Sequence, residues 1–77
     1  MSSDHYNCYL IEGIDDPKPA KPDSSLIAET YTHAAAKFIR SYPEYTGYVD
    51  VEDSGDGIVI TFAVEDGVVQ PVWKSLP

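Results

Sequence analysis

An acidic stretch with two glycines, EDSGDG at residues 52–57, has the composition of a calcium-binding loop. Loops of the EF-hand type need oxygen ligands at positions 1, 3 and 5, glycine at position 6 and a bidentate glutamate at position 12. Counted from Glu52, positions 3, 5 and 6 fit, but position 12 is Ala63. Residues 58–65 alternate as a strand, whereas the motif requires a helix there. We therefore expect a hairpin turn without calcium, in which aspartate and glycine supply the positive φ.

The other metal-binding and nucleophilic side chains do not form a recognisable site. A single cysteine, Cys8, excludes an internal disulfide, and the sequence has no paired Cys/His spacing of a zinc site. In a strand, His5 and Cys8 would lie on opposite faces because side chains alternate. Cys8 is typical of a small buried residue, and His33 of a solvent-facing residue in the first turn of a helix. No set of residues meets the geometric requirements of catalysis, so we expect no cofactor, no metal and no enzymatic activity.

Carboxylates and tyrosines gather around the expected hairpin. The net charge is −8, and the chain has no lysine or arginine from Ser41 to Trp73. Such a field repels nucleic acid and anionic lipid and favours a basic protein partner. Tyrosine is enriched at interface hot spots. The predicted partner-binding residues are Glu44, Tyr45, Tyr48, Asp50, Glu52, Asp53 and Asp56. The alternative interpretation is a solvated surface that keeps a small protein soluble.

The first part of the chain predicts two strands that are joined by a proline-rich loop. Residues 5–14, HYNCYLIEGI, alternate between two faces, as a strand does. Residues 15–24 hold three prolines in six positions, which favours an extended loop because proline fixes φ and lacks an N–H donor. The side chains of residues 25–31 alternate again and predict a second strand.

The segment 25–42 also has a second interpretation. Its apolar residues recur at helical spacing, which would make the whole segment one helix. We favour a strand followed by a helix over residues 32–42, because β-branched threonines near the junction weaken a continuous helix. Thr32 is then the N-cap of an alanine-rich helix. Pro43 ends the helix in either case.

Residues 48–74 predict a meander of three strands. YVDVED and IVITFAVE alternate apolar and polar side chains. Asp66-Gly67 is typical of a tight hairpin turn, and Pro71 places the last strand at a sheet edge because it cannot donate to a ladder.

These elements predict one α+β domain over residues 1–77, with one helix packed on a twisted, mainly antiparallel sheet in the order ββαβββ. A chain of this length buries only about 60% of its unfolded surface, so the core is thin. The predicted core consists of Tyr6, Cys8, Leu10, Ala35, Phe38, Ile39, Val49, Val51, Ile58, Ile60, Phe62 and Val64.

The N-terminal sequence MSSDHYNCYLIEG has no basic region followed by a long apolar stretch. It predicts neither a signal peptide nor a membrane span, and one cysteine fits a reducing compartment. We expect a cytoplasmic protein that binds neither membrane nor nucleic acid directly.

The order of strand, loop and strand, then TYTHAAAKFIRSY, then GYVDVEDSGDGIVITFAVEDG, resembles small phage and mobile-element proteins of the anti-CRISPR type. The resemblance covers Tyr6 to Trp73 and rests on the pattern of elements; the proline-rich loop departs from it. Proteins of that type are short, often acidic, and occlude the nucleic-acid or recruitment surface of a CRISPR effector. The resemblance implies a non-catalytic inhibitor, in the cytoplasm of the host cell, that binds a basic, nucleic-acid-binding surface as a DNA mimic. The alternative function is a structural or assembly module that forms a homodimer through an edge strand, with the acidity serving solubility only.

Overall fold

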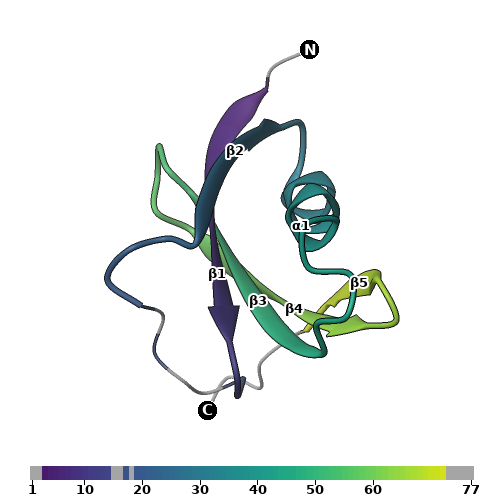
Figure 1. Ribbon diagram of the computed structural model, residues 1–77. Helices are drawn as coiled ribbons and strands as arrows, with labels where there is room; N and C mark the ends of the chain where they lie inside the picture. The colour runs from purple at the N-terminus through teal and green to yellow at the C-terminus, as the bar shows by residue number, and fades with distance from the viewer. Residues whose placement is uncertain (1–2, 15–16, 18, 73–77) are drawn as a thin grey trace.

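The computed structural model describes residues 3–14, 17 and 19–72. Its elements are β1 (Asp4–Ile11), β2 (Ser24–Ala28), α1 (Tyr31–Ile39), β3 (Gly47–Asp53), β4 (Val59–Glu65) and β5 (Val68–Pro71). The five strands form one antiparallel sheet in the order β2-β1-β3-β4-β5, and α1 packs across one face of it (Figure 1). The α+β class and the order ββαβββ are therefore confirmed, and the strand interpretation of the segment after the proline-rich loop holds.

The core lies between α1 and the sheet face that the helix covers. Alternation along the strands sends one set of side chains to this face, and the helix adds its own buried face. The fully buried side chains of greatest volume are Phe62, Val49, Val51 and Cys8. Burying one Val or Phe side chain contributes roughly 1.5–3 kcal/mol, so these residues supply much of the driving force of a small domain.

Most of the predicted core is buried, with one error. Ile58 is 55% exposed, because β4 begins only at Val59 and Ile58 still belongs to the turn. Leu10 and Ile60 pack against the core but are only partly buried. The sequence interpretation also omitted Tyr9, Ile11, Ala28 and Ala34, which are buried.

The prediction that Thr32 caps the helix is wrong. Thr30 is the N-cap: it has extended backbone angles (φ −141°, ψ 165°), and its Oγ1 accepts a hydrogen bond from the N–H of His33 at 3.0 Å. The cap thus lies two residues before the expected one, and the helix begins at Tyr31. The ring of Tyr31 packs edge-to-face on Tyr6, with ring centroids 5.0 Å apart.

The helix also ends earlier than expected, at Ile39 instead of residue 42. The N–H groups of Ser41 and Tyr42 bond to the carbonyls three residues before them, at 3.2 and 2.8 Å, which tightens the chain into a turn. Pro43 follows, and a proline disfavours helical angles in the residue before it. The other boundaries also differ: β1 ends at Ile11 instead of residue 14, β2 ends at Ala28 instead of residue 31, and residues 73–74 of the expected last strand lie outside the described residues.

The second sheet face is not covered by α1, the one helix in the described part of the chain. Its middle is nevertheless closed to solvent, with Tyr9 and Ile11 of β1 buried beside Thr61 of β4. The two ends of this face remain open, since Ile27 is 50% and Val68 55% exposed. A partner would therefore meet the ends of the sheet more readily than its centre.

Candidate functional site

The predicted partner-binding residues do not form one cluster. Glu44, Tyr45 and Tyr48 lie where β3 begins, whereas Asp53 and Asp56 lie where it ends. At about 3.4 Å per residue, the seven residues of β3 separate these two groups by roughly 20 Å. The structure thus divides the expected site between two ends of the sheet.

Tyr45 ties the chain before β3 to the end of β1. Its hydroxyl donates to the carbonyl oxygens of Ile11 at 2.7 Å and of Tyr48 at 2.9 Å. Gly47, with φ 152°, makes room for the ring: a Cβ there would lie 2.8 Å from the Tyr45 hydroxyl. Burial raises the pKa of Tyr45. The polar end of this side chain is therefore committed within the fold.

Asp50 does not lie on the acidic surface. It is 5% exposed, and its Oδ1 accepts a hydrogen bond of 2.6 Å from the hydroxyl of Thr61 on β4. A buried carboxylate needs such a partner, because an unpaired one would lose its hydration without compensation. Alternation in the sequence placed Asp50 opposite the core, but it could not show that the centre of the second face is closed.

Glu52 belongs to a polar row across three strands of the second face. Its Oε1 accepts from the hydroxyl of Tyr9 at 2.9 Å and from the amide of Asn7 at 3.4 Å. The hydroxyl of Ser25 on β2 donates to the other side of the Asn7 amide at 2.7 Å. Burial and this hydrogen bond to Glu52 raise the pKa of Tyr9. Glu52 is thus half-buried and has a structural role.

The acidic residues of the β3–β4 turn build the turn themselves. Asp53 Oδ1 accepts from the N–H of Gly55 at 2.7 Å, and Asp56 Oδ1 accepts from the N–H of Ile58 at 3.1 Å. Gly57 takes φ 76°, which a residue with a Cβ adopts at a cost. The stretch at residues 52–57, which has the composition of a calcium loop, is therefore a hairpin turn stabilised by its own aspartates.

A third carboxylate joins this turn from the start of β1. The pairing of Tyr6 with Asp53 brings Asp4 to the same end of the sheet, and the Ser54 N–H donates to the carbonyl of His5 at 3.0 Å. Burial raises the pKa of Tyr6, and Asp4, Asp53 and Asp56 raise it further. Sequence reasoning missed Asp4, since only the register between β1 and β3 places it beside residues about fifty positions later.

Tyr31 and Ile58 lie among these carboxylates. The hydroxyl of Tyr31 donates to the carbonyl of Ile58 at 3.3 Å. Burial raises the pKa of Tyr31, and Asp56 and Asp53 add to the effect. We call Asp4, Asp53 and Asp56, with Tyr31 and Ile58, the acidic corner. It joins an exposed apolar side chain and an aromatic ring to a carboxylate rim, the composition of an interface hot spot with a polar surround.

The basic residues of the described part of the chain lie elsewhere. Lys21 is in the loop between β1 and β2, and Arg40 follows the helix. Lys37, on the helix, donates from Nζ to the carbonyl oxygen of Ile27 at 2.7 Å. None of the three is among the groups that shift the pKa of Tyr6 or Tyr31. In the acidic corner Asp4 and Asp56 are exposed and Asp53 is partly exposed, so their charge is accessible from solvent.

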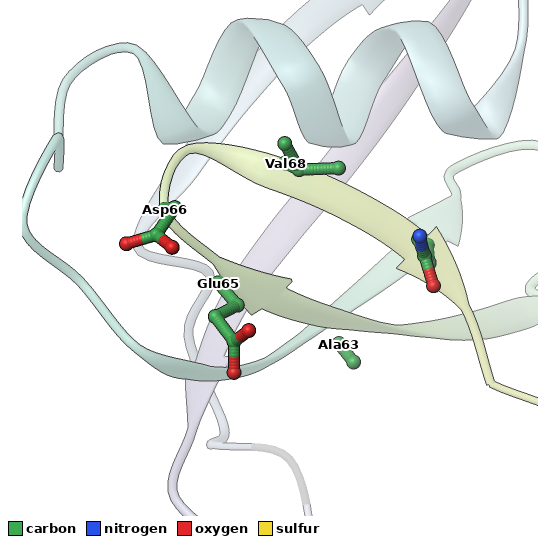
Figure 2. A pocket seen from close by; sticks show the side chains of 5 residues that line it. Ala63, Glu65, Asp66 and Val68 are labelled. Carbon is green, nitrogen blue, oxygen red and sulfur yellow. The ribbon is translucent and has the colours of Figure 1, made fainter.

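The opposite end of the sheet carries an open hollow of about 400 Å³ on the β4–β5 hairpin (Figure 2). It is lined by Ala63, Glu65, Asp66, Val68 and Gln70, which we call the hairpin hollow. The hairpin closes through Asp66 and Gly67, whose φ values of 54° and 77° are those of a type I′ turn. The expected two-residue turn is thus present, and its aspartate adds charge to the hollow.

Neither a metal centre nor a membrane span stands out in the described residues. They contain no group of three or more His, Cys, Asp or Glu side chains arranged to hold a metal ion. No helix among them is long and apolar enough to cross a membrane. Cys8 is buried, and burial raises the pKa of its thiol to about 11. His5 and His33 are exposed.

No protein-family model matches the chain, and searches of curated proteins and of solved structures found no match.

Proposed function

We propose that this chain is a non-catalytic inhibitor or modulator that binds a basic, nucleic-acid-binding surface of a protein partner. Following the resemblance of its pattern, the proposed partner is an effector subunit of a CRISPR system, met in the cytoplasm of a host cell. The acidic corner is the proposed contact site, and its carboxylates take the place of nucleic-acid phosphates against the partner's basic residues. The observation that carries the proposal is the grouping of three carboxylates around the exposed Ile58 and the partly buried Tyr31.

The two components of the corner have different parts in binding. Outward carboxylates steer a basic partner and raise the association rate, an effect that weakens with salt. Ile58 is 55% exposed and loses this exposure when a partner covers it. Buried apolar and aromatic anchors act mainly on the dissociation rate. The acidic corner thus combines long-range steering of the partner with a short-range apolar contact within one small surface.

The alternative, a homodimer through an edge strand, finds little support at either edge. The N–H of Ser54 donates to the carbonyl of His5, so the backbone N–H and C=O of His5 point toward β3 and away from β2. Ile27 of β2 lies opposite His5, and its backbone N–H and C=O therefore point outward from the edge of the sheet. The Ile27 carbonyl is occupied by Lys37. At the other edge, Pro71 has no N–H to offer. Lysine and proline are the usual means by which proteins protect edge strands from pairing.

The first experiment is affinity capture from the source cell, using the chain in three forms. The corner variant carries Asp4→Asn, Asp53→Asn and Asp56→Asn, and the matched control carries Glu12→Gln, Asp23→Asn and Glu29→Gln. Both remove three negative charges from exposed or half-exposed positions. We expect the parent and the control to retain a basic, nucleic-acid-binding protein and the corner variant to lose it.

Binding rates of the captured partner then separate steering from anchoring. The corner variant should associate more slowly and with a flatter salt dependence, whereas Ile58→Ala should mainly speed dissociation. An anchor at a hot spot contributes on the order of 1–3 kcal/mol. If the corner variant and the control bind equally fast at every salt concentration, the acidity serves solubility and the proposal fails. Recovery of the chain alone, with no basic protein, would favour the assembly module.

A further inference from the structure

The hairpin hollow combines charge with an apolar floor. Register pairs Ala63 with Gln70 and Glu65 with Val68, so these four side chains stand on one face of the hairpin. Val64 and Val69 between them pack toward the core, which places the hollow on the face opposite α1. Figure 2 shows Glu65 and Asp66 at the turn end of the hairpin, with Ala63 and Val68 along its strands. Two cross-strand pairs of side chains therefore line the hollow, and the carboxylate of Asp66 lies at its turn end.

We infer that the hairpin hollow receives one arginine side chain of the partner protein. This inference rests on the proposed function, since it names a second contact point for the same basic partner. It adds a site that lies at the other end of β4 from the acidic corner. The occupant is an arginine, and the reasons are charge, shape and hydrogen-bonding capacity.

Charge selects a cation. Glu65 and Asp66 both line the hollow and are exposed. Arg40 lines a separate hollow on the helix side, together with Gly67, so it does not line this one. Among the described residues no lysine or arginine lines this hollow, so a cation from a partner can meet the charge of Glu65 and Asp66 there.

Shape selects a cation with an apolar stem. Val68 is 55% exposed and Ala63 offers only a methyl group, so two of the five residues that line the hollow are apolar. A metal ion or an ammonium ion gains nothing from such a floor, whereas lysine and arginine lay their methylene stems on apolar surface and keep the charged group outside. The hollow is open to solvent and, at about 400 Å³, has room for one such side chain.

Hydrogen bonding selects arginine over lysine. The hollow offers the carboxylate of Glu65 and the amide oxygen of Gln70 from adjacent strands. A guanidinium group carries five donors in a planar fork and meets a carboxylate and a neutral acceptor together, whereas an ammonium group is a compact point charge. The two-residue turn holds both strands in place, so little freedom is lost on binding.

The test is a titration of the isotope-labelled chain, followed by NMR, with a capped Gly-Arg-Gly peptide. Peptides with lysine or citrulline in place of arginine serve as controls for donor geometry and for charge. We expect the largest amide shift changes within residues 63–70, tighter binding of the arginine peptide than of the lysine peptide, and no saturation with citrulline. Glu65→Gln should weaken arginine binding about twofold to fivefold, the range of an exposed ion pair. Glu29→Gln, which removes the same charge far from the hairpin, should leave it unchanged.

Two further variants test the apolar floor. Ala63→Leu fills the hollow and should abolish the shift changes, and Val68→Ala keeps the space but shortens the floor. Val68 is exposed, so its variant remains folded even if the leucine is not accommodated. Shift changes centred on the acidic corner, equal binding of lysine and arginine, or equal effects of Glu65→Gln and Glu29→Gln would overturn the inference.

The outcome is separate from that of the proposed function. If the parent captures a basic partner through the acidic corner but the hairpin shows no preference for arginine, the inference fails and the proposed function stands. If the hairpin binds the arginine peptide but no basic protein is captured, the proposed function fails and the subsite stands as a property of the chain.

Discussion

Replacing Thr30 tests whether this residue is the N-cap of α1. Thr30 Oγ1 accepts the N–H of His33 at 3.0 Å, while its carbonyl accepts the N–H of Ala34 at 2.9 Å. Thr30→Ala removes the first of these bonds and leaves one N–H at the start of the helix without its side-chain acceptor. Loss of such a cap costs about 1 kcal/mol. In a domain of this size, 1 kcal/mol shifts Tm by roughly 4–8 °C.

Thr32→Ala is the matched control, because it makes the same chemical change two residues later. Thr32 is exposed within the first turn, where alanine has the higher helix propensity. We expect its effect on the free energy of unfolding to stay within about 0.5 kcal/mol. Urea unfolding followed by circular dichroism gives both values, and Thr30→Ser should restore the parent's stability. A larger loss in Thr32→Ala than in Thr30→Ala would refute the assignment of the cap.

Three further outcomes follow from the buried contacts. Tyr45→Phe should destabilise the fold by about 1 kcal/mol, since the hydroxyl bonds to two carbonyls, whereas Tyr48→Phe should change it by less than about 0.5 kcal/mol in the same urea assay. Thr61→Val should cost about 1–3 kcal/mol, because it leaves the buried carboxylate of Asp50 without its donor; Thr61→Ser should not. The pKa of the Cys8 thiol is raised to about 11, so its contribution to stability is full below about pH 9 and is lost as the pH rises to about 11. Unfolding at pH 8, 9 and 10 should therefore show a loss above pH 9 that is smaller in Cys8→Ala.

The sequence determined the element types well because local and global preferences agree in this chain. Period-two alternation identifies the strands, the alanine run identifies the helix, and Asp66-Gly67 takes the positive φ values of its turn. The errors lie at junctions, where tertiary contacts decide. Tyr31 was assigned to the strand, but its ring packs on Tyr6, and this contact starts the helix earlier than propensity alone indicates.

Prediction of the candidate site was less complete, because binding surfaces depend on pairing between distant strands. The charge of the β3–β4 turn is visible in the sequence, but Asp4 joins it only through the register of β1 with β3. Asp50 was assigned to the surface by the same alternation that correctly placed Val49 and Val51 in the core. Alternation gives two faces and cannot show that the middle of the second face is closed to solvent.

The double role of the acidic residues decides which variants can separate charge from structure. Asp53 and Asp56 each use one carboxylate oxygen to hold a backbone N–H of the turn, so alanine at either position would remove the charge and the turn together. Asparagine retains an acceptor oxygen at the same place and is itself favoured in such turns. A slower association of the asparagine variant, at unchanged stability, therefore reports on charge alone. The same logic makes Asp50 unsuitable for that test, since its carboxylate is engaged with Thr61 inside the fold and its neutralisation would report on stability.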